Sequence, residues 1–141
     1  MEEKQLFNKV YQTNFESGKG NALQACIATL FNLKLDDTPN FINFPNYVEE
    51  LSKFLKPYNM TFIKYSTING KLEFEVFNSP YVLAAGKSPR GDYRHVVVGK
   101  INQVDFELVH DPYPDGSGLE GKPLWIGLFI SINPNSNLIK S

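Results

Sequence analysis

Cysteine and histidine, which most often serve as metal ligands and nucleophilic or basic groups, are scarce in this sequence. Its 141 residues include one cysteine, Cys26, and two histidines, His95 and His110. A single thiol excludes an internal disulfide and a cysteine-rich metal site. With so few candidates, each of these side chains can be considered individually, and no metal or organic cofactor is expected.

The sequence also lacks an excess of charge of either sign and a long hydrophobic run. Its net charge is −1, and the lysines and arginines are scattered rather than clustered, so we expect no nucleic-acid partner. The charged N-terminus "MEEKQLFNKVYQ" is unlike a signal peptide. The longest apolar run, residues 123–132, is much shorter than the roughly 20 residues of a membrane-spanning helix. These features predict a cytoplasmic protein without membrane contact, and they leave its oligomeric state open.

What the sequence does contain is enough apolar material for one core. Hydrophobic residues make up 42% of the chain, and no repeat or composition shift marks a second domain, so we expect a single domain over residues 1–141. The polar tail, about residues 133–141, is expected to be flexible.

Two helices are predicted in the first half of the chain. Apolar side chains recur three and four positions apart over residues 22–33, with small residues between them, which is typical of a centrally buried helix. Asn21 is placed to cap this helix. A second helix, about Asn46 to Lys56, is apolar on one side and charged on the other, and it ends before Pro57.

From Met60 onward the hydrophobic pattern has a period of two, which predicts strands. Residues 60–68 and 71–77 flank an Asn-Gly pair and are predicted to form a hairpin. Further strands are expected at 80–87, 95–101, 104–111 and 123–132. Two N-terminal helices followed by an antiparallel sheet define an α+β domain.

The clearest candidate for chemistry is a histidine beside an aspartate. In the predicted hairpin "HVVVGKINQVDFELVHD", with its turn near residues 102–103, His95 opens one strand and Asp111 closes the other, so the two should lie together. A carboxylate beside an imidazole orients the ring and stabilises its protonated form, as in a nucleophile–His–Asp triad. His110 should point to the opposite face from Asp111. Taken singly, either histidine could be an ordinary polar residue at a strand end.

The nucleophile is missing from the place where the pattern predicts one. A reactive thiol is favoured at a helix N-terminus, where the helix dipole and free amides lower its pKa. Cys26 lies about one turn inside the helix and is better interpreted as a small core residue. The position at the start of the helix is occupied by Ala22.

The order of the motifs resembles that of small papain-like cysteine hydrolases of bacteria and phages. The segments that carry the resemblance are "GNALQACIATLFNL", "LDDTPNF", "GKSPRGDYRHVVVG" and "LVHDPYPDGSGL". They are similar to the family's G-N-C or G-D-C followed by x-x-A-C-I-A-S-L, its V-P-x-F, its S-P-R-G with H-A-V-V, and its H-D-P-H-P. The resemblance extends from about Gln12 to Leu119, most of the chain, and implies a papain-like α+β fold. The cathepsin-type C-G-S-C-W signature is absent.

The resemblance implies a role for each matching residue. The nucleophilic cysteine falls on Ala22, the general base on His95 and the orienting acid on Asp111, while Cys26 matches a second cysteine of the motif. Gln12 is the candidate oxyanion donor, although its spacing from position 22 is longer than in papain. The implied activity is hydrolysis of an amide-type bond, peptide or isopeptide, with a small-molecule substrate as an alternative.

Ala22 leaves two explanations open. Either it replaces the cysteine of an enzyme, or the natural protein is a catalytically dead module that sequesters a peptide or a small nucleotide-like ligand. We favour the first, since the other site residues are present. Arg90 and Asn21 are the candidate substrate-binding residues. Arg90 is either part of a solvated turn or a reader of an anionic group, and Trp125 is expected in the core or at a pocket rim.

Overall fold

The computed structural model describes residues 8–16, 19–76 and 80–132 and shows an α+β fold. The two α-helices are α1 (Ala22–Leu30) and α2 (Tyr47–Leu55), and short 3₁₀ turns lie at Leu35–Asp37, Phe41–Asn43 and Lys56–Tyr58. The strands are β1 (Met60–Ser66), β2 (Tyr81–Lys87), β3 (Arg94–Asn102), β4 (Asp105–His110) and β5 (Glu120–Ser131). Among the described residues, no helix combines the length and apolar character needed to cross a membrane.

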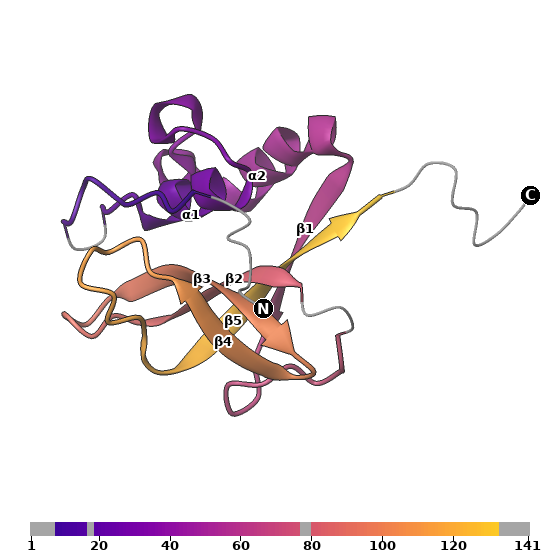
Figure 1. Ribbon diagram of the computed structural model, residues 1–141. Helices are drawn as coiled ribbons and strands as arrows, with labels where there is room; N and C mark the ends of the chain where they lie inside the picture. Colours follow the sequence, from indigo (N-terminus) through magenta and orange to yellow (C-terminus); the bar gives the residue numbers. More distant parts are fainter. Residues whose placement is uncertain (1–7, 17–18, 77–79, 133–141) are drawn as a thin grey trace, which may run out of the picture.

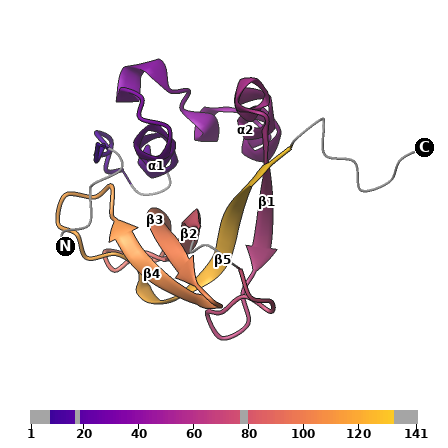
Figure 2. The same ribbon diagram turned by 45° about the vertical axis from the view of Figure 1, so that its right-hand side comes forward.

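All five strands form one antiparallel sheet in the order β1-β5-β2-β3-β4, and both helices pack on the same face (Figures 1 and 2). The core between the helices and the sheet includes Ile27, Phe41, Leu51, Leu83 and Trp125. A second apolar cluster contains side chains of alternate strand positions together with Leu72. The expected two-helix, antiparallel α+β arrangement is therefore confirmed.

The first helix is shorter than its hydrophobic pattern predicted. It ends at Leu30 instead of Leu33, because Asn32 adopts a left-handed conformation with φ of 55°. The amide of Asn32 then donates to the carbonyl of Thr29, and the amide of Leu33 donates to that of Ala28 at 2.9 Å. This pair of bonds is the Schellman arrangement that closes many helices. Leu33 therefore continues the apolar pattern after the helix has ended.

The predicted hairpin between residues 60–68 and 71–77 is wrong in its second half. The turn is present, since Asn69 and Gly70 both have positive φ and Ile68 bridges Lys71. Beyond it the chain leaves β1 and runs to the β3–β4 turn, where Val76 bridges Gln103. The partner of β1 is β5 instead, with Met60 opposite Ser131. Alternation specifies that a segment can be a strand, but it does not choose the partner. Phe77 lies outside the described residues.

The other elements follow the prediction closely. The second helix is confirmed, with the side chain of Asn46 accepting a hydrogen bond from the amide of Glu49. The strands expected at 80–87, 95–101 and 104–111 correspond to β2, β3 and β4. The last strand begins at Glu120 rather than Pro123. The tail at 133–141 lies outside the described residues.

Candidate functional site

His95 and Asp111 are in direct contact, as their positions in the hairpin predicted. The Nε2 atom of His95 lies 2.7 Å from Oδ1 of Asp111, and the two residues are only 4% and 5% exposed. A carboxylate oxygen can only accept, so Nε2 carries the proton. In the neutral ring, Nδ1 is then the free basic nitrogen.

A bulge in the strand pair explains how the two side chains reach each other. Gly99 pairs with Leu108, but Val98 pairs with His110, so one residue of β4 is left over between them. The paired residues end at His110; if the register continued one residue further, Asp111 would lie opposite Val97, two positions from His95 on the same side of the ladder. Without the bulge, Asp111 would fall opposite the neighbouring position, and its side chain would turn to the other face.

Asp111 is held by backbone donors as well as by His95. The amide of Tyr113 donates to Oδ1 at 2.9 Å, and the amide of Gly118 donates to Oδ2 at 2.7 Å. Burial acts to raise the pKa of Asp111, but the hydrogen bonds from His95, Tyr113 and Gly118 outweigh it, and the pKa is lowered. Asp111 is therefore an ionised carboxylate that fixes the His95 ring.

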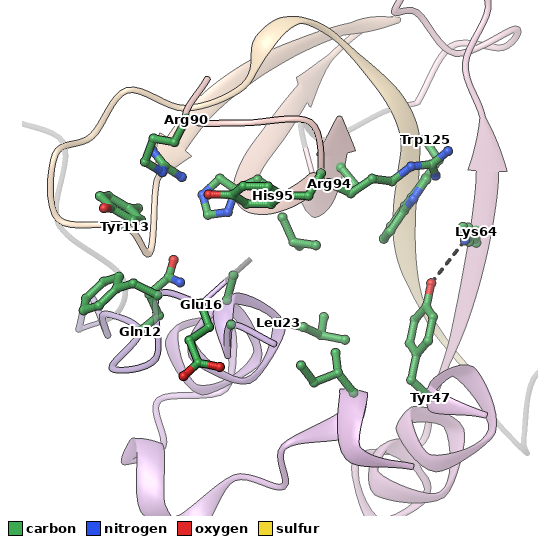
Figure 3. A pocket seen from close by; sticks show the side chains of 17 residues that line it. Gln12, Glu16, Leu23, Tyr47, Lys64, Arg90, Arg94, His95, Tyr113 and Trp125 are labelled. Carbon is green, nitrogen blue, oxygen red and sulfur yellow. Dashed lines mark hydrogen bonds between the residues drawn. The ribbon is translucent and has the colours of Figure 1, made fainter. Parts of the chain in front are cut away.

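A cavity of about 360 Å³ opens beside this pair, and Ala22 at the start of α1 lines it together with His95 and Gln12 (Figure 3). Aromatic side chains, including Phe15, Tyr113 and Trp125, form much of the remaining wall. The start of a helix presents free amides and a partial positive charge. The cavity thus combines an oriented imidazole, a helix N-terminus and apolar walls.

Asn21 has a different role from the two that the sequence predicted. Its side chain forms no capping bond with α1. Instead, Oδ1 accepts the amides of Thr13 and Asn14, both at 2.9 Å, and Nδ2 donates to Thr13 and to Gln24. Asn21 is buried and lies outside the set of residues that line the cavity. It fastens the N-terminal segment to the start of α1, and the substrate-binding role is not supported by this placement.

Gln12 lines the cavity and is only 6% exposed. The backbone amide of Gln12 donates to the carbonyl of Pro112, just beyond Asp111. The side-chain Nε2 of Gln12 donates to the carbonyl of Asn14 at 3.0 Å. The second Nε2 proton is not used by that bond. Within the described residues, the buried Oε1 atom has no hydrogen-bond partner.

Gly20 permits this close approach of the N-terminal segment. A Cβ atom at position 20 would lie 3.0 Å from the carbonyl oxygen of Asn14 and 3.2 Å from Nε2 of Gln12. Both contacts are tighter than ordinary packing, and one is with backbone. Glycine is therefore needed here to bring Gln12 beside the start of the helix.

The two remaining chemical candidates lie elsewhere. Cys26 is fully buried, its Sγ is 3.5 Å from the carbonyl oxygen of Val96, and burial together with the charge of Asp111 raises its pKa well above the ordinary value. This agrees with its interpretation as a core residue. Nε2 of His110 donates to the carbonyl of Val10 at 2.6 Å, and its ring meets Tyr11 edge to face. His110 therefore anchors the N-terminal segment.

Arg90 lines the cavity, but one nitrogen and one face of its guanidinium already have partners. Nη1 lies 3.4 Å from Asp115 and 2.9 Å from Oγ of Ser117. The guanidinium also stacks on the Tyr113 ring, with its carbon 3.5 Å from the ring centre (Figure 3). Its Nε is buried without a partner in the described part of the chain. Arg90 thus joins the loop before His95 to the loop after Asp111.

Sequence reasoning missed several residues that line the cavity or hold Asp111. Tyr113 and Gly118 hold Asp111 through backbone amides, which no side-chain pattern could indicate. Lys64 and Tyr47 come from β1 and α2, and they meet at the end of the cavity away from Arg90 and Tyr113 (Figure 3). Within the residues described, no group of three or more His, Cys, Asp or Glu side chains is arranged to hold a metal ion.

Comparison with known proteins adds no relative: no protein-family model, no curated protein and no solved structure matches this chain. The site must therefore be interpreted from its own geometry.

Proposed function

We propose that this domain has the architecture of a papain-like cysteine hydrolase whose nucleophile position is occupied by Ala22. The observation that supports the proposal is the His95–Asp111 pair, 2.7 Å apart and buried, on a cavity that Ala22 also lines from the start of α1. A nucleophile at a helix N-terminus, a base and an acid that orients the base are the three parts of such a site.

With cysteine at position 22, the chemistry follows from the parts in place. Nδ1 of His95 takes the thiol proton, and the thiolate attacks the carbonyl carbon of an amide to form a tetrahedral intermediate. The imidazolium then protonates the leaving amine as the carbon–nitrogen bond breaks, which leaves an acyl-enzyme thioester. Water attacks the thioester with His95 again as base, releasing the acid and restoring the thiol. Asp111 keeps the ring oriented throughout.

The oxyanion of the intermediate needs donors close to position 22. The backbone amide of residue 22 is one, and the uncommitted Nε2 proton of Gln12 is the second. Donors of this kind are typically worth about 3–4 kcal/mol of transition-state stabilisation. The hydrogen bonds that fasten residues 12–14 to Asn21 and Pro112 hold Gln12 beside the helix start.

The chain with Ala22 can bind such a substrate but cannot form the thioester. This favours a second candidate function, a binding module that retains a peptide or small-molecule ligand uncleaved. The codon for residue 22 in the natural gene distinguishes the two functions. A cysteine codon indicates an enzyme, and an alanine codon indicates a binding module.

The proposal is tested by the Ala22→Cys protein. The helix N-terminus and His95 should lower the pKa of the new thiol toward about 3–4, as in papain-type pairs, against about 8.5 for free cysteine. Its alkylation rate with iodoacetamide should then change little between about pH 5 and pH 7, because the thiol is already ionised. The rate of a free thiol instead falls about tenfold for each pH unit of acidification over this range. Mass spectrometry of the labelled peptides gives the rate at residue 22 and at Cys26 separately.

His95→Ala in the Ala22→Cys background is the matched variant, and it should restore the steep pH dependence of an ordinary thiol. His110→Ala in the same background should not, because His110 contacts Val10 and Tyr11 rather than Asp111. A residue 22 thiol that titrates like free cysteine in the parent Ala22→Cys protein would overturn the hydrolase proposal.

A further inference from the structure

We propose that the end of the cavity bounded by Lys64, Arg94, Tyr47 and Trp125 binds a negatively charged group of the ligand, a carboxylate or a phosphate. This deepens the proposed function, on which it rests, by naming a substrate class: an amide compound that carries an anionic group on the side of the cavity away from Arg90.

Lys64 is held in position by side chains from two other elements. Its Nζ donates to the hydroxyl of Tyr47 at 3.1 Å and lies 4.7 Å from the centre of the Trp125 ring (Figure 3). These contacts join β1, α2 and β5. An ammonium group has three protons, so two remain after the bond to Tyr47. A lysine restrained in this way loses less conformational freedom on binding than a free surface lysine.

Arg94 adds a second positive charge to the same end. Figure 3 shows its side chain extending from the start of β3 toward Trp125. Within residues 8–16, 19–76 and 80–132, neither Lys64 nor Arg94 forms an ion pair with a carboxylate. Both charges therefore remain available to a ligand.

Positively charged side chains outnumber negatively charged ones in the described lining of the cavity. Lys64, Arg90 and Arg94 are cationic, and Glu16 is the one acidic side chain among the described lining residues. Glu16 comes from the N-terminal segment and lies across the cavity from Lys64 and Arg94 in Figure 3. A cleft lined by one sign of charge between low-dielectric walls concentrates ligands of the opposite sign.

The two arginines of the cavity are not equivalent. The Arg90 guanidinium is partly neutralised by Asp115 and stacked on Tyr113. Of the two roles considered for Arg90, anion binding is therefore assigned to the end formed by Lys64 and Arg94 instead. The cavity then has a reaction end, with Ala22, His95 and Gln12, and a recognition end. Trp125 supplies the apolar wall of the latter.

The test measures binding to the protein as it is, with Ala22, using two pairs of probes. N-acetylglutamate methylamide and N-acetylglutamine methylamide differ only in the charge of the side chain, and adenosine 5′-monophosphate and adenosine differ by the phosphate. Trp125 is the only tryptophan, so its fluorescence reports occupancy directly, and calorimetry detects binding that does not alter the emission. In at least one pair, the charged probe should bind about tenfold more tightly, a difference of about 1.4 kcal/mol.

The preference should disappear in Lys64→Gln and Arg94→Gln and should survive in Lys64→Arg, which keeps the charge. Lys53→Gln is the matched control: Lys53 lies on α2 beside Glu49 and Glu50, outside the cavity lining, and its replacement changes the net charge equally. A preference confined to the carboxylate pair identifies an acidic peptide, and one confined to the phosphate pair identifies a phosphorylated compound.

Equal affinity within both pairs, absence of binding by all four probes, or a preference that persists in Lys64→Gln and Arg94→Gln would each overturn the proposal. No measurement here depends on a thiol, so this outcome is independent of the alkylation of the Ala22→Cys protein. The proposal of an anion subsite can therefore be wrong while the hydrolase proposal holds, and the hydrolase proposal can be wrong while the anion subsite exists.

Discussion

Cys26 and position 22 lie four residues apart on α1, about one helical turn, yet their surroundings differ in both properties that control thiol reactivity. Cys26 is fully buried, and burial raises its pKa. Ala22 is itself only 9% exposed, but it lines the cavity at the end of the helix where anions are stabilised. One turn of helix thus separates a site suited to a nucleophile from a site suited to a core residue.

From the burial of this single residue, we predict that Cys26 resists alkylation in the native protein. A buried thiol with a raised pKa is exposed only when the structure opens, so native labelling by iodoacetamide should be at least about 100-fold slower than labelling in denaturant. The same reagent applied in guanidinium is the control, since unfolded Cys26 reacts as a free thiol. Native labelling as fast as that of free cysteine would reinstate Cys26 as a candidate nucleophile.

Among the elements, the β3–β4 pair contributes most to the site because its bulge brings Asp111 to the side of the ladder on which His95 lies. Gly99 lies on β3 beside this bulge and pairs with Leu108. A Cβ atom there would collide with the Phe106 ring and with the backbone carbonyl of Glu107. Backbone cannot move aside as a flexible side chain can, so glycine is required for this register.

We therefore expect Gly99→Ala to lower the free energy of unfolding by about 1–3 kcal/mol, the usual cost of overpacking. Urea denaturation followed by fluorescence measures the loss. Ser66→Ala, at an exposed position of β1, is the control and should stay within about 0.5 kcal/mol of the parent. A fully stable Gly99→Ala protein would mean that the bulge does not depend on glycine.

Over the whole molecule, the site is a meeting point of three distant parts of the chain. Residues 12–14 are tied to the start of α1 through Asn21, and the amide of Gln12 is bonded to Pro112 in the loop that follows Asp111. His110 strengthens the same junction through its bond to Val10. Asp111 and His110 at this junction are titratable, so the free energy of unfolding should depend on pH.

The sign of the pH effect is the same for both groups. Hydrogen bonds from His95, Tyr113 and Gly118 outweigh burial and lower the pKa of Asp111 below its ordinary 3.8, so its contribution is present above that pH and is lost on acidification. Burial, with a smaller effect from Lys9, lowers the pKa of His110 below 6.5 against the opposing influence of Val10 and Asp111. The unfolded chain then binds the His110 proton more readily, so stability falls as the pH drops below 6.5.

We predict that the free energy of unfolding decreases in two stages on acidification, first below about pH 6.5 and again below about pH 4. Urea denaturation across this range measures the profile. His110→Gln should remove the first stage, and Asp111→Asn should reduce the second while lowering stability at neutral pH. Stability that rises as the pH falls from neutral to weakly acidic would contradict the pKa direction of His110. Stability that does not fall further below about pH 4 would contradict that of Asp111.

Much of this arrangement could be predicted from the sequence, and the failures share a cause. The helices, strands β2 to β4 and the contact of His95 with Asp111 all depend on residues close in sequence or joined by one short turn. The partner of β1, the internal role of Asn21 and the pairing of Arg90 with Asp115 depend on segments that meet only after folding. A propensity describes one segment and contains no information about its neighbour in space.

The sequence by itself determined the α+β class, the buried character of α1 and the presence of an imidazole and a carboxylate at one end of a hairpin, because hydrophobic period and turn chemistry are local properties. Only the tertiary structure decided that Lys64, Tyr47 and Trp125 meet at the far end of the cavity that Gln12, Ala22 and His95 line (Figure 3). Those contacts arise from the order β1-β5-β2-β3-β4, which brings together strands remote in the chain. That order depends on how whole elements bury their apolar faces against one another, which is a property of the assembled core rather than of any segment.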